Sequence, residues 1–355
     1  MTGGMTAGVG LMAAQSNLFR IKRQKEKLGI ALVGLGYYAT DVLAPRLQKT
    51  EHCYLAGIVT GTLEKEKIWM DKYNIPKKNV YNYDNYDEIA DNDDIDIIYV
   101  VLPNSMHAEY TIRAAKAGKH VICEKPMALS TDECQAMIDA CNENNVSLSI
   151  GYRMQFEPTT QEIMKWGKEK AFGDIKYVHA SAAFTWPSHM PHDHWKLVRS
   201  YGGGPLMDMG VYSIQGARYS TQEEPISVSG QIFQPDTKFY QEVPETVTMQ
   251  LEFPSGAVAN LTTSFGMSTN QLYVVCTDGW FLIDPFSSYG GIKGTSSNGD
   301  ILFPKVDQQA TQMDETAICI KEGKPMRVPG EEGLADIKIV EAIEESIKTG
   351  KPVKI

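Results

Sequence analysis

Gly29-Ile-Ala-Leu-Val-Gly34-Leu-Gly36-Tyr-Tyr-Ala39 is the stretch that decides the fold of this 355-residue chain. Its first half is typical of a buried strand, and its second half has the G-x-G-x-x-A form of a dinucleotide-binding turn. In such a turn Gly34 permits the tight bend, Gly36 lets the backbone approach a pyrophosphate, and Ala39 allows close packing of helix on strand. The motif is weak alone, but a predicted helix and a second strand at residues 54–59 supply the context that it requires.

Strands and helices alternate through residues 29–151, and this order predicts a doubly wound α/β domain with a parallel Rossmann sheet. Its later strands are predicted at residues 95–102, 121–123 and 147–150. Strands dominate residues 152–355, which predicts a substrate-binding and oligomerisation domain of the α+β class with a large, mostly antiparallel sheet. The strands of that sheet are predicted at about residues 176–184, 226–233, 246–253, 257–265, 272–276 and 280–283, and a final helix at 334–348.

The end of the second strand bears on the choice of cofactor. An acidic residue there would bind the ribose 2′-hydroxyl of NAD, but this chain has Thr60-Gly61-Thr62 instead. Lys65 follows, and its ammonium group could pair with the 2′-phosphate of NADP. We therefore favour NADP over NAD. The alternative is that Lys65 and Lys67 lie on a solvent-exposed face of a helix.

The segment Val121-Ile-Cys-Glu124-Lys125-Pro126 is interpreted as a strand that ends at a corner. Pro126 cannot donate to a sheet, and it biases the preceding residue toward an extended conformation. Lys125 is therefore expected at the carboxyl end of a strand, which is the edge where open α/β sheets bind ligands.

Another group of polar residues follows the glycine loop Gly202-Gly-Gly204. Asp208, Tyr212 and Gly216 are spaced by four, so they share one face of a helix, and Gly216 permits close packing. One interpretation is a proton-transfer site beside a nicotinamide. The alternative is a hydrogen-bonded tyrosine in the protein core.

Composition argues against several other classes of protein. The formal charge of −10, without a basic block, argues against a nucleic-acid surface, and no 18-residue apolar run predicts a membrane helix. The histidines of His189-Met-Pro-His192-Asp-His194 lack the spacing of a zinc motif, so we expect no metal. Cys134 and Cys141 lie on one predicted helix, roughly 10 Å apart along its axis, which is too far for a disulfide.

These residues together resemble the glucose–fructose oxidoreductase (Gfo/Idh/MocA) family, over nearly the whole chain from about residue 29. The Glu124-Lys-Pro126 corner is typical of the broad family, in which many members carry a histidine where this chain has Tyr212. The more specific matches are Leu102-Pro-Asn-Ser-Met-His-Ala-Glu109, Gly202-Gly-Gly-Pro-Leu-Met-Asp-Met-Gly-Val-Tyr-Ser213, Glu223-Glu-Pro225 and Pro329-Gly-Glu-Glu-Gly333.

The resemblance implies that Lys125 and Tyr212 are the catalytic pair and that Asp208 supports them. Lys125, Arg153, Trp195, Asp208 and Tyr212 would also contact the substrate. The cofactor site that the resemblance and the turn motif imply comprises Gly34, Leu35, Gly36, Tyr37, Tyr38, Thr60, Gly61, Thr62, Lys65, Tyr81, Leu102, Pro103, Asn104, His107, Glu124, Lys125, Arg153, Trp195 and Tyr289.

The expected activity is that of an NADP-dependent sugar oxidoreductase, which moves a hydride between an aldose and the nicotinamide. A tyrosine can accept the proton of the sugar hydroxyl if a neighbouring cation stabilises its phenolate form. One alternative is an NAD-dependent glycosidase of the same superfamily. Another is a non-catalytic regulator that senses NADP or a sugar, although Lys125, Asp208 and Tyr212 count against it.

Two expectations concern location and assembly. We interpret residues 1–28 as an N-terminal arm or the remnant of an export signal, because Met1–Ala14 is rich in small and apolar residues. The resemblance implies a periplasmic or exported protein, with the cytoplasm as the alternative because a twin-arginine start is missing. Since the predicted helices are too few to cover both faces of the second sheet, we expect a homodimer or homotetramer formed through its open face.

Overall fold

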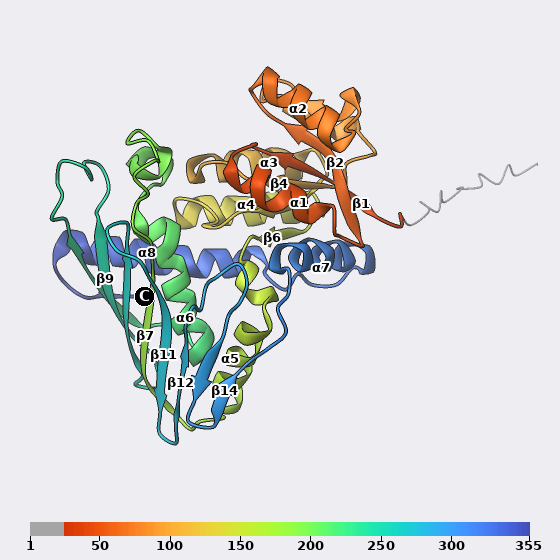
Figure 1. Cartoon of the computed structure of the whole chain (residues 1–355). Coiled ribbons are helices and arrows are strands. Elements are labelled where there is room, and N and C mark those ends of the chain that lie inside the picture. The colour runs from red at the N-terminus through yellow and green to blue at the C-terminus, as the bar shows by residue number, and fades with distance from the viewer. Residues whose placement is uncertain (1–24) are drawn as a thin grey trace, which may run out of the picture.

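The computed structural model describes residues 25–355, so the N-terminal arm or signal remnant predicted at residues 1–28 lies almost wholly outside the described residues. The described chain contains two sheets, each with its own set of helices (Figure 1). No helix within the described residues is long and apolar enough to cross a membrane.

The first sheet has six parallel strands in the order β3-β2-β1-β4-β5-β6, which confirms the predicted Rossmann sheet. Its strands are β1 (Leu28–Val33), β2 (Cys53–Val59), β3 (Val80–Tyr81), β4 (Ile97–Val100), β5 (His120–Cys123) and β6 (Leu148–Ile150). The strand order reverses between β1 and β4. Ligands bind at the carboxyl ends of strands beside such a switch point.

The helices of this part follow the strands as the alternation predicts. They are η1 (Tyr38–Leu43), α1 (Ala44–Leu47), α2 (Leu63–Tyr73), η2 (Lys77–Asn79), η3 (Tyr86–Asp91), η4 (Asn104–Met106), α3 (His107–Lys116) and α4 (Thr131–Glu143). The segment η1 has the wider π-helical spacing and continues directly into α1. Helix α4 begins where the sequence indicates, because the Ser130 side chain accepts a hydrogen bond from the backbone N–H of Glu133.

The second sheet has nine strands in the order β14-β13-β12-β11-β7-β10-β9-β8-β15. They are β7 (Ile175–Ala183), β8 (Ser227–Phe233), β9 (Thr246–Glu252), β10 (Val258–Ser264), β11 (Thr269–Cys276), β12 (Trp280–Ile283), β13 (Gly294–Ser296), β14 (Gly299–Ile301) and β15 (Val353–Lys354). Every neighbouring pair is antiparallel except β7 and β10, so the predicted mostly antiparallel sheet is confirmed. The sequence did not predict the short strands β13, β14 and β15.

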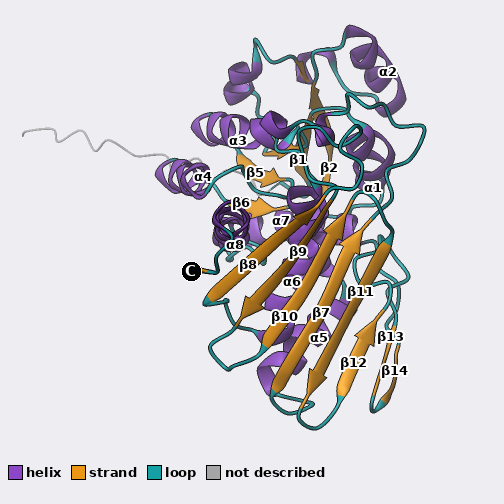
Figure 2. Ribbon diagram, turned by 90° about the vertical axis from the view of Figure 1, so that its left-hand side faces the viewer, coloured by secondary structure: helices purple, strands orange, loops and turns teal. Residues whose placement is uncertain are grey.

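Helices lie on one face of the second sheet, and Figure 2 shows the strands in front of them with no described element covering the other face. The helical segments that follow β6 in the chain are η5 (Arg153–Phe156), α5 (Pro158–Glu169), η6 (Trp195–Leu197), η7 (Arg199–Tyr201), η8 (Leu206–Gly210), α6 (Val211–Thr221), α7 (Gln308–Glu322) and α8 (Gly330–Thr349). Helix α8 begins one turn before the prediction. Helix α6 packs tightly on the sheet at Gly216, where an added Cβ would lie 3.3 Å from Ala180.

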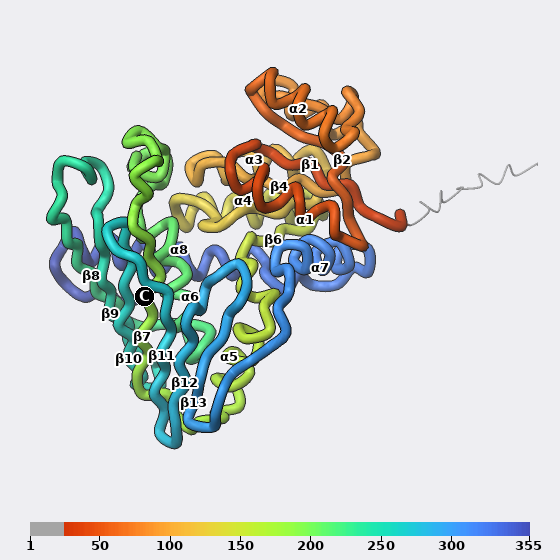
Figure 3. The backbone as a smooth tube through the Cα atoms, viewed as in Figure 1, coloured from red at the N-terminus to blue at the C-terminus, as the bar shows by residue number. Residues whose placement is uncertain are grey.

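Helix α7, which the sequence did not predict, belongs with the first sheet rather than the second (Figure 3). Its residues Met313 and Ala317 are buried in the same apolar cluster as Leu32 of β1. The Asp314 carboxylate accepts hydrogen bonds from the backbone N–H groups of residues 51 and 52. The chain therefore returns to the first sheet after β14, before β15 adds the last strand of the second sheet, and α7 forms part of the site described next.

Candidate active site

Lys125 lies just beyond the end of β5 and contacts the helix that carries Asp208. Its ammonium nitrogen is 3.4 Å from one carboxylate oxygen of Asp208 and also donates to the backbone oxygen of that residue. Lys196 binds the other carboxylate oxygen at 2.7 Å. Asp208 lies in η8, a π-helical turn that leads into α6, and such turns are frequent at functional sites. The first sheet and the second part of the chain thus meet at one carboxylate between two lysines.

This cluster is buried and its charges are strongly coupled. Only 13% of the Lys125 side chain and 11% of the Asp208 side chain are exposed. Burial by itself would raise the pKa of Asp208, but the ammonium groups of Lys196 and Lys125 outweigh it and lower that pKa to about 2. Burial lowers the pKa of Lys125, whereas negative charge at Tyr212, Asp208 and Glu124 raises it, and the net shift is upward. Lys125 is therefore a cation and Asp208 an anion at neutral pH.

Tyr212 lies in α6, and two cations face its ring. The Lys125 ammonium nitrogen is 4.8 Å and the Arg153 guanidinium carbon 5.2 Å from the ring centroid. Arg153 also lies 4.4 Å from the centroid of Tyr289, whose ring is 6.2 Å from that of Tyr38. Together these side chains form a column in the order Lys125, Tyr212, Arg153, Tyr289 and Tyr38, which ends beside the glycine turn after β1.

Arg153 is held from several directions, although it is almost completely buried. One terminal nitrogen donates to the backbone oxygen of Ser287 at 2.6 Å. The other donates to the backbone oxygen of Ser288 at 3.1 Å and to the side-chain oxygen of Gln308 in α7. A guanidinium group fixed in this way is a permanent positive charge beside Tyr212.

Glu124 directly precedes Lys125 in the chain, and its side chain is buried. Its carboxylate accepts a hydrogen bond from the Tyr99 hydroxyl at 2.6 Å, and burial raises its pKa. Burial, together with Glu124, also raises the pKa of Tyr38 and of Tyr99 well above the ordinary value. At neutral pH the hydroxyl groups of these two tyrosines therefore stay protonated, so neither can act as a base.

The glycine turn has the shape that the motif predicts. Gly34 has a φ of +89°, and an added Cβ would lie 2.5 Å from the backbone oxygen of Val101, so only glycine fits there. At Gly36 an added Cβ would meet nothing within 4 Å, which leaves the backbone open to a ligand. The Lys65 ammonium group donates to the Leu35 backbone oxygen at 2.8 Å, so α2 brings a cation to this turn.

Two predicted residues, His107 and Asn104, bind backbone groups around the site and connect its segments. The ring nitrogens of His107 lie 2.8 Å from the Pro126 oxygen and 2.9 Å from the Leu102 oxygen, so this buried imidazole connects the ends of β4 and β5. Burial lowers the pKa of His107, whereas the hydrogen bonds to these two backbone oxygens oppose that shift. Asn104 follows Pro103 and donates to the backbone oxygen of Gly202 at 2.8 Å, which joins the first sheet to the loop before α6.

The remaining predicted residues differ in how near they lie to Lys125. Trp195 is close to the cluster, because the Lys196 ammonium group lies 5.8 Å from its ring. Tyr37 is 70% exposed at the glycine turn, and Thr60, Gly61 and Thr62 lie between β2 and α2. The Tyr81 ring is buried and its hydroxyl accepts a hydrogen bond from Asn92, so the structure does not bring it to the Lys125 cluster.

Lys196, Gln308, Gln309 and Gln312 are site residues that the sequence did not reveal. Lys196 lies in the short helical turn η6, which the sequence did not predict, and the three glutamines are on α7, which was not predicted either. No signal in the sequence marks these glutamines, because the helix that carries them has no apolar stripe.

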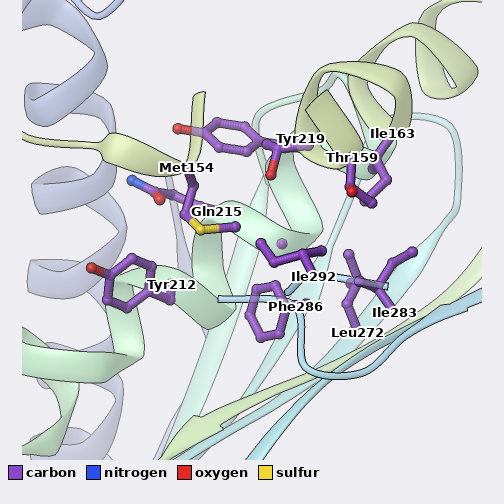
Figure 4. A pocket seen from close by; sticks show the side chains of 12 residues that line it. Met154, Thr159, Ile163, Tyr212, Gln215, Tyr219, Leu272, Ile283, Phe286 and Ile292 are labelled. Atoms are coloured by element: carbon purple, nitrogen blue, oxygen red, sulfur yellow. The ribbon is translucent and has the colours of Figure 1, made fainter. Parts of the chain in front are cut away.

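A small cavity of about 20 Å³ lies behind Tyr212, between α5, α6 and the second sheet. Its walls are mostly apolar and include Met154, Leu272 and Phe286. Figure 4 shows that the Tyr212 ring forms part of its edge while the hydroxyl points away from it. We interpret this cavity as a packing defect large enough for about one water molecule, and not as the substrate site. Within the described residues no group of His, Cys, Asp or Glu side chains is arranged to hold a metal ion.

This group of side chains can accept a proton from a substrate, because charged groups surround the hydroxyl-bearing ring. A buried phenol faces two cations, one of which is fixed by an ionised carboxylate, and the group lies at the edge of the sheet where dinucleotides bind.

Comparison with known families covers most of the chain in two parts. Residues 28–152 match GFO/IDH/MocA, described as an oxidoreductase family with an NAD-binding Rossmann fold. Residues 160–282 match the GFO/IDH/MocA C-terminal domain.

Individual relatives agree with these matches. Trans-1,2-dihydrobenzene-1,2-diol dehydrogenase from Xenopus laevis is 31% identical over 263 residues, which cover 73% of this chain and 76% of that protein. D-xylose 1-dehydrogenase (NADP(+)) from Haloarcula marismortui is 25% identical over 334 residues, 92% of each chain. The crystal structure of aldose-aldose oxidoreductase from Caulobacter crescentus complexed with glycerol has a TM-score of 0.89 and 40% identity, and the match covers 93% of this chain and 100% of that one.

Proposed function

The chain belongs to the GFO/IDH/MocA oxidoreductase family, and from this premise we propose that it is an NADP-dependent sugar oxidoreductase acting on an aldose. The observation that carries the proposal is the contact of Lys125 with Tyr212 and Asp208 across the two sheets. The similarity to an aldose-aldose oxidoreductase and to a xylose dehydrogenase that uses NADP supports the substrate class and the cofactor.

The residues of the site fit a dinucleotide. Gly36 leaves an open approach to the backbone of the turn, and the polypeptide continues from the turn into the first turn of η1. The carboxyl ends of β4 and β5 bring Asn104 and Lys125 to the same edge. When bound, the nicotinamide would supply the chemistry of hydride transfer with the sugar carbon.

In the proposed mechanism Tyr212 takes the proton of the sugar hydroxyl that is oxidised. Tyr212 can accept this proton only in its phenolate form. Lys125 and Arg153 face its ring and stabilise the negative charge of that phenolate. Asp208 holds Lys125 in place and keeps it charged, and Lys196 balances the second oxygen of the carboxylate. The partly buried setting makes each of these interactions stronger than it would be in water.

The direct test combines a nucleotide assay and a sugar panel. The purified protein should yield NADP(H) on denaturation or bind it when added, and at least one aldose should reduce the bound nucleotide. If no aldose or polyol changes the nicotinamide absorbance in a protein that binds nucleotide, the proposed activity is wrong. Net cleavage of a glycoside, without turnover of added nucleotide, would instead identify a glycosidase.

Lys65→Ala should weaken NADP(H) binding at least about tenfold and leave NAD(H) binding almost unchanged, because a charge-assisted hydrogen bond to a phosphate contributes roughly 1.5–3 kcal/mol. The Lys65 side chain is exposed beside the glycine turn, where it now donates to Leu35. Titration of both reduced nucleotides by fluorescence measures the effect. Lys67→Ala, two residues along the same helix, is the matched control. Equal losses for the two nucleotides would show that Lys65 does not recognise the 2′-phosphate.

The open face of the second sheet supports a homo-oligomer, and the outward residues of its central strands carry no charged side chain. They are Tyr177, His179 and Ser181 of β7, Val258, Asn260 and Thr262 of β10, and Gln271, Tyr273 and Val275 of β11. Depletion of charge is typical of interface cores. We propose that this face joins two copies of the chain, as a dimer or as half of a tetramer.

Tyr273→Lys should convert the oligomer to monomers, because it places an unpaired charge in the centre of the proposed interface. Light scattering at micromolar concentration measures the mass of both proteins. Lys168→Glu, an exposed change on α5 behind the sheet, should leave the mass unaltered. A monomeric wild-type protein would exclude this assembly.

A further inference from the structure

Three glutamines near the start of α7 contact residues of the site, namely Arg153, Tyr38 and Tyr99. Gln308, Gln309 and Gln312 are each no more than 1% exposed. Gln308 accepts a hydrogen bond from Arg153 and donates to the Ser288 backbone oxygen at 3.0 Å, so both ends of its amide are used. Because all three point to the interior from a helix that packs on the first sheet, they are part of the site and not of the surface.

The other two glutamines are only half satisfied. The Gln309 amide nitrogen lies 3.4 Å from the Tyr38 hydroxyl, and the Gln312 amide nitrogen lies 3.5 Å from the Tyr99 hydroxyl. Among the described residues neither side-chain oxygen has a hydrogen-bond partner. Rotating an amide by 180° would only exchange the unpaired oxygen for an unpaired nitrogen. A buried polar group without a partner is costly, so a missing ligand or water is expected.

The position of Gln309 indicates which ligand this is. Tyr38, which its amide approaches, begins the helix directly after the glycine turn, and the Tyr38 ring lies beside Tyr289 of the aromatic and cationic column that contains Tyr212. Gln309 therefore lies between the turn that would hold the pyrophosphate and the residues that would act on the sugar. A dinucleotide spans this interval, and its nicotinamide carries a carboxamide whose NH₂ group is a hydrogen-bond donor.

We propose that the side-chain oxygen of Gln309 accepts a hydrogen bond from the carboxamide NH₂ of the nicotinamide and thereby fixes the orientation of the ring. This inference rests on the proposed use of a nicotinamide cofactor. Gln312 is not given this role, because its amide group lies beside Tyr99, whose hydroxyl donates to the buried Glu124. Gln309 is thus a binding and positioning residue that acts on the cofactor.

The test compares NADP⁺ with its 3-acetylpyridine analogue, in which a methyl group replaces the amide nitrogen of the carboxamide. Dissociation constants are measured by calorimetry without any sugar, so that activity is not the readout. Gln309→Met keeps the length of the side chain but removes the acceptor. It should weaken NADP⁺ about tenfold and change the affinity for the analogue less than about twofold, as expected for loss of one buried hydrogen bond.

Two further variants make the result specific. Gln312→Met removes the other unpaired oxygen, one turn farther along α7, and should leave the preference for NADP⁺ over the analogue intact. Gln309→Glu keeps an acceptor oxygen and should retain most of that preference. Thermal unfolding of each variant without nucleotide checks that the fold is preserved, and if Gln309→Met does not fold, Gln309→Leu takes its place.

The outcomes separate this inference from the proposed function. Equal losses for NADP⁺ and the analogue in Gln309→Met, or loss of the preference in Gln312→Met instead, would overturn the role of Gln309 while the oxidoreductase proposal stands. A wild-type protein that binds neither nucleotide would contradict the proposed function and this inference together.

Discussion

Lys125→Met should lower kcat at least a thousandfold while the protein keeps its fold and its bound nucleotide. Methionine preserves much of the packing against the Tyr212 ring but removes the ammonium group that lies 4.8 Å from its centroid. The phenolate then loses one of its two cations, and the substrate loses a positioning donor. A general base contributes roughly 10²–10⁴-fold, and Lys125 acts both on that base and on the substrate.

The fold should survive because Asp208 retains a partner. Lys196 remains 2.7 Å from the second carboxylate oxygen, so the buried charge is not left alone. Steady-state oxidation of an accepted sugar gives kcat, and the nucleotide released on denaturation gives the occupancy of the site. Lys196→Met is the matched control, since it removes a cation from the same carboxylate but faces Phe184 and Trp195 instead of Tyr212. A rate loss in Lys196→Met as large as in Lys125→Met would assign the effect to Asp208 and not to the base.

Tyr212→Phe should lower kcat by about 10²–10⁴-fold, which corresponds to roughly 3–5 kcal/mol of transition-state stabilisation. The phenyl ring keeps its place between Lys125 and Arg153, so the change removes the proton acceptor and little else. Nucleotide occupancy should stay at the wild-type level, because the glycine turn and Lys65 lie away from this hydroxyl.

A second buried tyrosine on the same helix provides the comparison for this variant. Tyr219 lies two turns along α6, and its hydroxyl accepts a hydrogen bond from Gln155 at 3.0 Å. Tyr219 is as buried as Tyr212, so Tyr219→Phe should cost some stability but leave kcat within a few fold of the wild type. If Tyr212→Phe retains more than about a tenth of kcat while chemistry limits the rate, Tyr212 is not the base and is a core tyrosine.

The first sheet could be predicted from the sequence, because each pattern that indicates it lies within a short stretch of residues. The buried strand before Gly34, the glycine turn and the strand that ends at Glu124-Lys-Pro126 each depend on a few neighbouring residues. The same is true of the turn residues Pro254-Ser-Gly256 and Asp278-Gly279, which lie in the hairpins that join β9 to β10 and β11 to β12. The spacing of Asp208, Tyr212 and Gly216 likewise placed them on one helix, with Gly216 against the sheet.

Long-range packing decided the rest. Lys125 and Asp208 are 83 positions apart in the chain and meet only through tertiary packing. The second cation on that carboxylate, Lys196, lies in the short turn η6, which no sequence pattern marked. Helix α7 was missed because its buried face mixes Met313 and Ala317 with Gln309 and Gln312, so no apolar stripe marks it. Local sequence determined the elements and the chemical groups that each presents. Only the tertiary structure decided which groups face Tyr212 and which buried acceptors remain free for a ligand, since these depend on contacts between residues far apart in the chain.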